Sequence, residues 1–472
     1  MTAAPPVAPA RSMLAPTVGP FVDTSRARAD SAVRWGFLVA CWSALLLVSY
    51  WWATGGGFQG LGGWTTGLMS TGRLTGLLAS VLLLVQVLLM ARLPLLERAF
   101  GQDRLARVHR LVGFTSFNLM VAHLVLITYG YASGELTRTP ATLWDLTIHY
   151  PGMLLAVAGT GCLVMVVVTS VKAARRRIRY ESWHLLHLYA YLGVGLALPH
   201  QLWTGQDFLA STARTVFWWG LWTTAVVCVL VWRLGLPWWR SARHRVRVTS
   251  VIAEGDGFVS VHLAAGGSPV RAEAGQFFNF RFLNGRGWTR AHPYSLSAAP
   301  DGRHLRITVK MVGDGSAALR ALSPGTRVLV EGPYGRLSDR ARTRRRVALV
   351  GAGVGVTPLR ALAESMPYLP GEAVLLYRYT GTPLFAGELR RLADERGLHV
   401  VLLPGHRRYA GSWLGSGIGG ADDRTALEHW VPDIAERDVY VCGPQAWAED
   451  FRRTTVAAGL HEANFHVESF GW

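Results

Sequence analysis

The chain of 472 residues has few cysteines and very few lysines. Its four cysteines form no CxxC pair, and three of them, Cys41, Cys162 and Cys228, lie in apolar segments. We therefore expect neither structural disulfides nor an iron–sulfur cluster. Only two of the 48 basic residues are lysine, Lys172 and Lys310, a bias that we attribute to genome composition rather than to a ligand.

Acidic residues are also scarce, and the net charge is +18. The positive charges gather beside apolar runs, so membrane topology explains them more simply than nucleic-acid binding, and we expect no nucleic-acid partner. Residues 1–30, rich in Pro, Ala and Arg, are predicted to be a disordered tail, and no signal peptide is expected. Six apolar runs long enough to cross a bilayer follow, at 34–53, 72–92, 108–130, 151–171, 183–203 and 213–233.

Basic residues are concentrated in alternate connections between these runs. Four arginines separate the second and third runs, four arginines and a lysine separate the fourth and fifth, and five arginines follow the sixth. The other connections carry few charges. The positive-inside rule then places both termini and the soluble half in the cytoplasm of a protein of the cell membrane.

Two apolar runs carry a pair of histidines each. His109 and His123 are fourteen residues apart, and His187 and His200 are thirteen apart with Pro199 beside the last. In a helix these spacings separate two levels by roughly 20 Å. A single membrane histidine is explained by a hydrogen bond to a neighbouring helix, but two pairs at matched depth favour two haem irons with paired imidazoles. His109 and His187 would hold the inner haem, and His123 and His200 the outer one.

The soluble half changes pattern twice. From about residue 243 to 342, short alternating strands broken by Gly, Pro and Asp are typical of an antiparallel barrel or sandwich. From 343 to 472, buried strands alternate with helices, as in a parallel α/β sheet. We thus predict a multi-domain membrane protein: a six-helix transmembrane domain over 31–236, an antiparallel β-barrel domain over 243–342 and an α/β parallel-sheet domain over 343–472.

Glycine-rich turns in this half suit phosphate binding. The run VKMVGDGSAAL at 309–319 offers backbone N–H groups and a hydroxyl at a helix start, although a hairpin with an ordinary capped helix explains it equally well. A stronger signal is ALVGAGVGVTPLRAL at 348–362, where a buried strand runs through Gly351, Gly353 and Gly355 into a helix.

Arginines stand where a dinucleotide-binding site for NAD would have an acidic residue. Arg378 follows the glycine run by about twenty residues, and Arg407 and Arg408 follow the next strand. Guanidinium groups there suit the 2′-phosphate of NADPH, so NADPH is favoured over NADH. The alternative is that they are solvated surface arginines.

Five motifs follow one another in the soluble half: HPYSLS at 292–297, VKMVGDGS at 309–316, GAGVGVTP at 351–358, VCGP at 441–444 and HVESFGW at 466–472. In this order they resemble the ferredoxin–NADP reductase superfamily. With the six apolar runs and two histidine pairs in front, the chain from about residue 34 to 472 resembles the ferric reductase and NADPH oxidase family of transmembrane flavocytochromes b.

The resemblance implies a role for each motif. Ser295 would lie near N5 of the flavin, and Cys442, Gly443 and Pro444 would lie beside the nicotinamide, with Glu468 supporting hydride transfer. The family order W-x-x-x-H favours His187 over His184. The implied flavin contacts are Arg290, His292, Pro293, Tyr294 and Ser295; the FAD phosphate contacts are Lys310, Gly313, Gly315 and Ser316; and the NADPH pyrophosphate contacts are Gly351, Gly353, Gly355, Thr357 and Pro358.

The terminal aromatic residue is ambiguous. Phe470 would cover the isoalloxazine until NADPH displaces it, but Gly471 and Trp472 follow, so Trp472 is an alternative stacking residue. The prediction as a whole is a transmembrane oxidoreductase that passes electrons from cytoplasmic NADPH through FAD and two b-type haems to a ferric chelate or dioxygen outside. The alternative is a cytochrome b reductase subunit that passes electrons to a partner protein, which the primary reading does not require.

Overall fold

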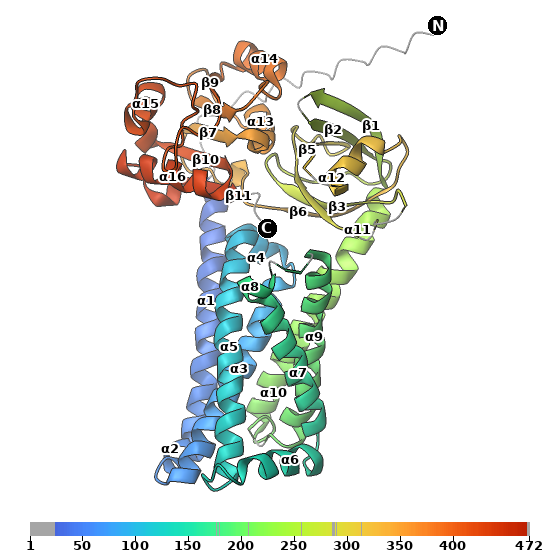
Figure 1. Cartoon of the computed structure of the whole chain (residues 1–472), viewed down its shortest axis with the longest axis vertical. Helices are drawn as coiled ribbons and strands as arrows, with labels where there is room; N and C mark the ends of the chain where they lie inside the picture. Colours follow the sequence, from blue (N-terminus) through green and yellow to red (C-terminus); the bar gives the residue numbers. More distant parts are fainter. Residues whose placement is uncertain are drawn as a thin grey trace. The chain divides into compact units, whose positions relative to one another are not determined.

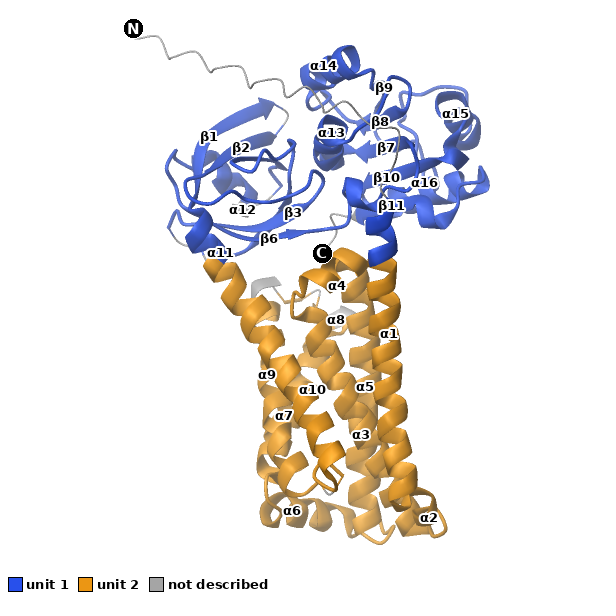
Figure 2. Ribbon diagram, turned by 180° about the vertical axis from the view of Figure 1, so that it is seen from behind, with its two compact units in different colours: residues 1–29, 240–472 blue, residues 30–239 orange. Residues whose placement is uncertain are grey.

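The computed structural model describes residues 24–469 except 176, 179, 206, 256, 286–287, 289 and 313. The chain divides into two compact units, which Figure 2 colours separately: unit 1 comprises residues 1–29 and 240–472, and unit 2 comprises residues 30–239. This division does not separate the parts predicted to bind FAD and NADPH, so the boundary near residue 343 stays a prediction.

Unit 2 is a bundle of long helices that run side by side (Figure 1). The closest pairs are α3 with α5 and α7 with α9. Helix α9 continues through Pro199 as far as Trp203. The helices are α1 (Ser25–Trp52), α2 (Phe58–Gly60), α3 (Trp64–Met90), α4 (Pro94–Phe100), α5 (Gln102–Tyr131), α6 (Thr139–His149), α7 (Met153–Ser170), α8 (Lys172–Arg175), α9 (Tyr180–Trp203), α10 (Thr212–Cys228) and, from unit 2 into unit 1, α11 (Leu236–His244).

Five helical segments of the described chain are long and apolar enough to cross a membrane: 25–60, 64–90, 102–131, 153–170 and 212–244. They cover five of the six predicted runs. The remaining run, 183–203, lies in α9, whose start adjoins the undescribed residue 179. An apolar, membrane-type helical unit is therefore confirmed, and the count of six spans stays a prediction.

The predicted disordered tail, residues 1–30, extends too far along the chain. Helix α1 begins at Ser25, so residues 25–30 are helical. Arg26, Ala27, Arg28 and Ala29 are good helix formers and continue directly into the apolar span, which explains the difference. Residues 1–23 lie outside the described residues.

The first part of unit 1 holds two three-stranded antiparallel sheets, ordered β1-β2-β5 and β4-β3-β6. They share one apolar core, to which alternate residues of β2 such as Val259, Val261 and Leu263 contribute. A closed barrel, as predicted, is not shown, because in the described chain the two sheets are joined only by isolated bridges at Arg247↔Arg327 and Leu296↔Ile307. The strands are β1 (Val246–Gly255), β2 (Phe258–Ala265), β3 (Phe277–Phe282), β4 (His292–Ser295), β5 (His304–Lys310) and β6 (Val328–Tyr334); helix α12 (Asp314–Ala317) follows β5.

The second part is a parallel sheet, as the sequence predicts, and it has five strands in the order β11-β10-β7-β8-β9. Ligands of such sheets bind beyond the carboxyl ends of the strands, where β7 and β10 lie side by side here. The strands are β7 (Arg346–Ala352), β8 (Ala373–Tyr379), β9 (His399–Pro404), β10 (Arg437–Gly443) and β11 (Phe465–Ser469); the helices are α13 (Val356–Ser365), α14 (Ala386–Arg396), α15 (Asp423–Trp430) and α16 (Gln445–Ala457).

Candidate functional site

His109 of α5 and His187 of α9 lie close together in unit 2. Their ring centroids are 6.1 Å apart, with 65° between the ring planes. Two imidazoles that bind one ion from opposite sides with metal–nitrogen bonds of about 2 Å have centroids about 6 Å apart. Nδ1 of His109 lies 3.3 Å from the carbonyl oxygen of Gln86, and Nδ1 of His187 lies 3.3 Å from Oγ of Ser170. Because Nδ1 is engaged in each ring, Nε2 is the nitrogen left for a metal.

Trp183 supports the inner pair from one turn earlier on α9. Its indole N–H donates to Ser170 Oγ over 3.2 Å, the same hydroxyl that faces His187. Its ring centroid lies 5.0 Å from that of His187, and the guanidinium of Arg175 lies 4.5 Å from the Trp183 ring. The hydroxyl, the indole and the cation together restrict the orientation of the His187 ring.

In the outer pair, His123 and His200, the ring of His123 packs against glycines of α3. Nδ1 of His123 lies 2.8 Å from the carbonyl oxygen of Gly72. A Cβ added at Gly76 would lie 2.5 Å from the same nitrogen, so only glycine leaves room for the ring. His200 lies within electrostatic range of His123, and its buried Nδ1 has no hydrogen-bond partner among the described residues.

Gly72 and Gly76 were not predicted as site residues. The sequence could have indicated them, because small residues four apart in an apolar run are typical of close contacts between helices. Within the described chain, no group of three or more His, Cys, Asp or Glu side chains could hold a metal ion. A haem held by two imidazoles needs only two protein ligands, and these partly buried rings, three of which have an engaged Nδ1, fit that donor set.

In unit 1, strand β4 consists of the predicted flavin residues His292–Ser295. The rings of His292 and Tyr294 are stacked 6.0 Å apart, and burial raises the pKa of Tyr294 to about 12, so its hydroxyl stays protonated. Ser295 is buried and ends the strand. Arg290 lies exposed just before it. The strand therefore offers a ring surface followed by a hydroxyl, as flavin binding would need.

The predicted FAD phosphate loop follows β5. The ammonium group of Lys310 lies 5.9 Å from the centroid of the Phe258 ring. Ser316 Oγ accepts a hydrogen bond of 3.0 Å from the backbone N–H of Val312, and Gly315 lies inside the short helix α12. Gly313 lies outside the described residues. Both predicted readings of this run, phosphate nest and capped hairpin, stay open.

The glycine loop after β7 packs against the end of β10. Gly353 has a φ of +57°, which favours glycine, and a Cβ at Gly355 would lie 2.1 Å from the carbonyl oxygen of Cys442. Thr357 Oγ1 donates to the carbonyl of Val354 over 2.8 Å, and Pro358 lies in the first turn of α13. The predicted pyrophosphate loop and the Cys442 turn are thus neighbours.

A third segment reaches the same place. Glu468 of β11 is the register partner of Cys442. A Cβ at Gly335 would lie 3.0 Å from Oε1 of Glu468 and 3.2 Å from the ring of Phe277, which pairs with Ser295. Gly335 and Phe277 therefore lie between the Cys442–Glu468 pair and Ser295, and the assignment of these three residues to the hydride-transfer site stays a prediction. Phe470 and Trp472 lie outside the described residues. Gly443 ends β10, and Pro444 precedes α16.

The predicted 2′-phosphate arginines differ in their surroundings. Arg378 pairs in register with Ala352 beside the glycine loop, and its guanidinium lies 5.7 Å from the Trp447 ring. Burial, with a smaller effect from the charge of Arg407, lowers the pKa of Arg378. Within the described chain its Nε has no hydrogen-bond partner. Arg378 is therefore poised to receive an anion.

The positive charge of Arg407 is already balanced by a carboxylate of the chain. It forms an ion pair with the buried carboxylate of Asp450 and donates from Nε to the carbonyl of Ser412 over 2.8 Å. Arg408 is exposed and donates to the carbonyl of Ala421 over 2.6 Å. Sequence position alone could not distinguish these two arginines from Arg378.

Residues 75–198 match the family model described as "Ferric reductase like transmembrane component". That range includes His109, His123 and His187 and ends two residues before His200.

Curated relatives match just under half of this chain. The glycine betaine monooxygenase reductase subunit of Chromohalobacter salexigens is 29% identical over 49% of this chain and 66% of its own length. The ferredoxin–NAD(+) reductase component of the alkene monooxygenase system of Xanthobacter autotrophicus is 33% identical over 45% of this chain and 65% of its own length. A flavohemoprotein of Xylella fastidiosa is 28% identical over 45% and 54%. The chain thus spans between about half and two thirds of these relatives.

Among solved structures, the FAD/NAD-binding domain of a nitric oxide dioxygenase from Vibrio cholerae covers 49% of this chain and 100% of its own, with 24% identity and a TM-score of 0.39. A cytochrome P450 reductase from Amycolatopsis covers 48% of this chain and 69% of its own, with 23% identity and a TM-score of 0.41. The family match and the curated relatives together confirm the predicted resemblance: the chain combines a stretch similar to the transmembrane component of ferric reductases with a part similar to ferredoxin reductase components and flavohemoproteins.

Proposed function

We propose that this chain carries electrons from cytoplasmic NADPH through FAD and two b-type haems to a ferric chelate or dioxygen on the outer side of the cell membrane. One observation carries the proposal. A pair of imidazoles spaced for one metal ion, His109 and His187, lies inside the stretch that matches the ferric-reductase-like transmembrane component.

The cofactors would supply the change from two-electron to one-electron chemistry, since a flavin takes up a hydride and gives up electrons singly while haem iron takes one electron at a time. The residues of the chain bind and orient. Gln86, Gly72 and Ser170 hold three imidazole rings through Nδ1. Glu468, which pairs with Cys442 and lies near Gly335, would help to exclude water from the reacting atoms.

NADPH is proposed as the electron donor because of Arg378. Its guanidinium lies at the carboxyl edge of the sheet, is partly buried and stacks on Trp447, and its Nε has no hydrogen-bond partner among the described residues. A 2′-phosphate would supply the missing charge. Arg407 would contribute less, because Asp450 compensates it.

The proposed acceptor is reached from the outer haem edge. Because two histidines would hold each haem iron, neither a ferric chelate nor dioxygen would need to bind the metal. Electron transfer from the haem edge requires no general acid or base. The charge asymmetry of the connections supports a cytoplasmic position for both termini and for unit 1.

The test is a visible spectrum of the detergent-purified full chain with added FAD, recorded without oxygen before and after NADPH. The proposal expects two haems per chain with b-type spectra, both reduced by NADPH. Absence of haem from folded, FAD-loaded protein would contradict it. Admission of a ferric chelate or of oxygen to the reduced protein then identifies the acceptor by the rate at which each one reoxidises the haem.

The names of the relatives favour a second candidate. Two of them are a reductase subunit and a reductase component of multi-component systems. The chain would then pass its electrons to a partner protein. NADPH oxidation by the isolated chain with a ferric chelate or oxygen supports the primary proposal, whereas haem that is reduced but reoxidised by neither acceptor supports the second.

A further inference from the structure

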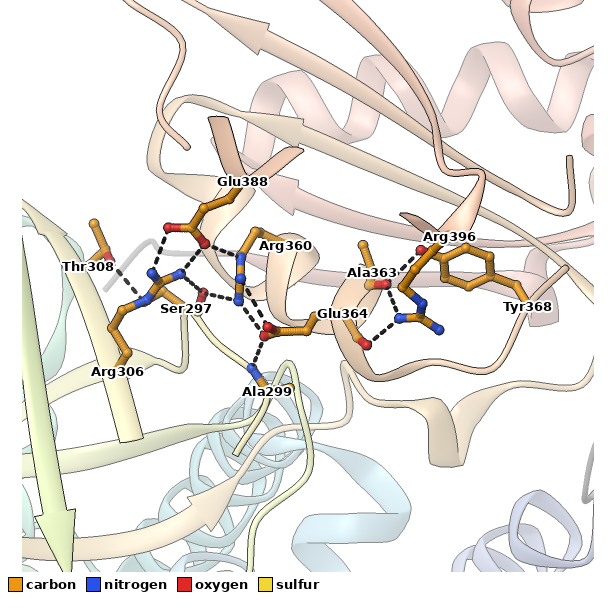
Figure 3. Close-up of polar contacts among 10 residues, drawn as sticks. All are labelled: Ser297, Ala299, Arg306, Thr308, Arg360, Ala363, Glu364, Tyr368, Glu388 and Arg396. Carbon is orange, nitrogen blue, oxygen red and sulfur yellow. Dashed lines mark hydrogen bonds and ion pairs between the residues drawn. The ribbon is translucent and has the colours of Figure 1, made fainter. Parts of the chain in front are cut away.

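A cluster of four charged side chains joins the two parts of unit 1 (Figure 3). Arg306 comes from β5, Arg360 and Glu364 come from α13, and Glu388 comes from the first turn of α14. Arg360 is only 2% exposed. Its Nε lies 2.7 Å from Glu388 Oε2, and it also pairs with Glu364, while Arg306 Nη1 lies 2.8 Å from Glu388 Oε1. The two positive and two negative charges cancel, as burial requires.

This cluster holds the segment that follows the flavin strand. The carbonyl of Ser297 accepts hydrogen bonds from Arg306 Nη2 at 2.7 Å and Arg360 Nη1 at 3.4 Å. The hydroxyl of Ser297 accepts from Arg306 Nε at 3.1 Å, and the N–H of Ala299 donates to Glu364 Oε2 over 2.6 Å. Residues 297–299, which begin two residues after Ser295, are therefore fixed to α13.

The same helix carries the nucleotide loop. Helix α13 begins at Val356, directly after Gly355, and Arg360 lies about 6 Å further along its axis. The position of the glycine loop relative to the end of β4 is thus set by one short, rigid helix and the charges on its side. Within this cluster, Arg360 links Glu364 of its own helix, Glu388 of α14 and the Ser297 carbonyl.

We propose that Arg360 is a positioning residue for hydride transfer from NADPH to FAD. In that step the C4–H bond of the dihydronicotinamide breaks and the hydrogen moves with both electrons to N5 of the flavin, so the nicotinamide is oxidised as the flavin is reduced. Arg360 fixes the spacing between the loop that would bind the nucleotide and the strand that would bind the flavin. The proposal rests on the function proposed above.

Arginine suits this role because of its shape. Its planar fork can meet two carboxylates and a carbonyl at once, whereas the single ammonium group of lysine keeps the charge but not this geometry. Displacement of reacting groups by about 1 Å can slow a reaction by about 10²-fold. Loss of the fork should therefore slow the chemical step more than it weakens nucleotide binding.

Arg396 provides a matched control in the same region of Figure 3. It lies in the last turn of α14 and donates to the carbonyls of Ala363 at 2.7 Å, Met366 at 2.6 Å and Glu364, whose side chain it does not contact, with its guanidinium 4.5 Å from the Tyr368 ring. These contacts tie α14 to the carboxyl end of α13. They do not include residues 297–299.

The experiment is anaerobic stopped-flow reduction of the flavin in the full, FAD-loaded chain over a range of NADPH concentrations. For Arg360→Met we expect the limiting rate to fall at least about tenfold. The NADPH concentration for half-maximal rate should change less than about threefold. Arg360→Lys should recover part of the rate, and Arg396→Met should stay within about twofold of the wild type at a similar loss of thermal stability.

Equal limiting rates for Arg360→Met and Arg396→Met would overturn the proposal. Should Arg360→Met fail to retain FAD, Glu364→Gln takes its place, because it preserves volume and an acceptor for Ala299 while removing one charge; a wild-type rate in that variant overturns the proposal and a slower one supports it. If NADPH does not reduce the wild-type flavin at all, the function proposed above fails, a result that is distinct from either outcome.

Discussion

The two units orient their candidate site residues by different means. In unit 2, His109 and His123 are held by the backbone carbonyls of Gln86 and Gly72. In unit 1, the segment after the flavin strand is held by charged side chains such as Arg360. A carbonyl is a neutral acceptor that an apolar surrounding tolerates, whereas a charge there is costly. Unit 2 does contain ion pairs, such as those of Asp207 with Arg73 and Arg214, but in the described chain they do not contact the four candidate histidines.

The two histidine pairs also differ in how firmly their rings are held. Both rings of the inner pair have an Nδ1 contact, from Gln86 and from Ser170. In the outer pair only His123 has one, since Nδ1 of His200 has none in the described chain. The outer pair is less fixed, and we expect the outer haem to be the first one lost when detergent is increased.

The largest expected effect is loss of a haem. Each of His109→Ala, His123→Ala, His187→Ala and His200→Ala should leave one haem per chain instead of two, because one haem would lose one of the two histidines proposed to hold it. Haem is counted by its absorbance against protein and FAD. His184→Ala, one turn from His187, is the control and should retain two; two haems in any of the four ligand variants would remove that residue from the site.

The second prediction concerns the contact between Gly76 and the imidazole ring of His123. A side chain at position 76 would collide with the His123 imidazole, so Gly76→Val should reduce the content of the outer haem by at least about half. Gly161→Val in α7 is the matched control, because nothing lies within 4 Å of a Cβ there. Equal haem content in the two variants would show that the contact with Gly76 does not position His123.

A smaller effect is expected from the charged site in unit 1. Arg378→Ala should raise the KM for NADPH about tenfold, which corresponds to about 1.4 kcal/mol. The KM for NADH should change little. Arg424→Ala, on the exposed face of α15, controls for the loss of one positive charge. An equal rise for NADH and NADPH would assign Arg378 to a phosphate that both nucleotides share.

The smallest effect on electron transfer should come from Asp438, a fully buried carboxylate at the amino end of β10. Burial by itself raises its pKa, but hydrogen bonds from His466, Asn464 and the backbone N–H of Thr343 outweigh burial and hold the pKa below its usual value. A depressed carboxyl pKa stabilises the fold above about pH 4, and this contribution is lost as pH falls through the folded-state pKa.

Asp438→Asn should therefore lower the free energy of unfolding at pH 7 by about 3 kcal/mol while turnover per FAD-loaded molecule is unchanged. The difference from the wild type should shrink as the pH falls below about 4. Denaturation followed by flavin fluorescence measures the free energy of unfolding at each pH, and NADPH oxidation per FAD measures turnover. The exposed Asp394→Asn serves as control. A loss of turnover without a loss of stability would give Asp438 a functional role instead.

The sequence predicted what depends on local pattern. Apolar runs and histidine spacing placed α5 and α9 and brought His109 to His187, and the glycine run predicted the contact region around Gly355. Contacts between segments that are far apart in the sequence could not be predicted. The meeting of Gly76 with His123, and of Arg360 with Glu388 and Ser297, depends on the packing of elements that no local period encodes.

The most direct test of the relay compares His109→Ala with His123→Ala, each loaded with FAD and given NADPH without oxygen. The account predicts that His123→Ala keeps an inner haem that NADPH reduces at the wild-type rate. It predicts that His109→Ala keeps an outer haem that stays oxidised on that time scale, because its electron donor is missing. Equal reduction of the remaining haem in both variants would contradict an ordered path from NADPH through the inner haem to the outer one.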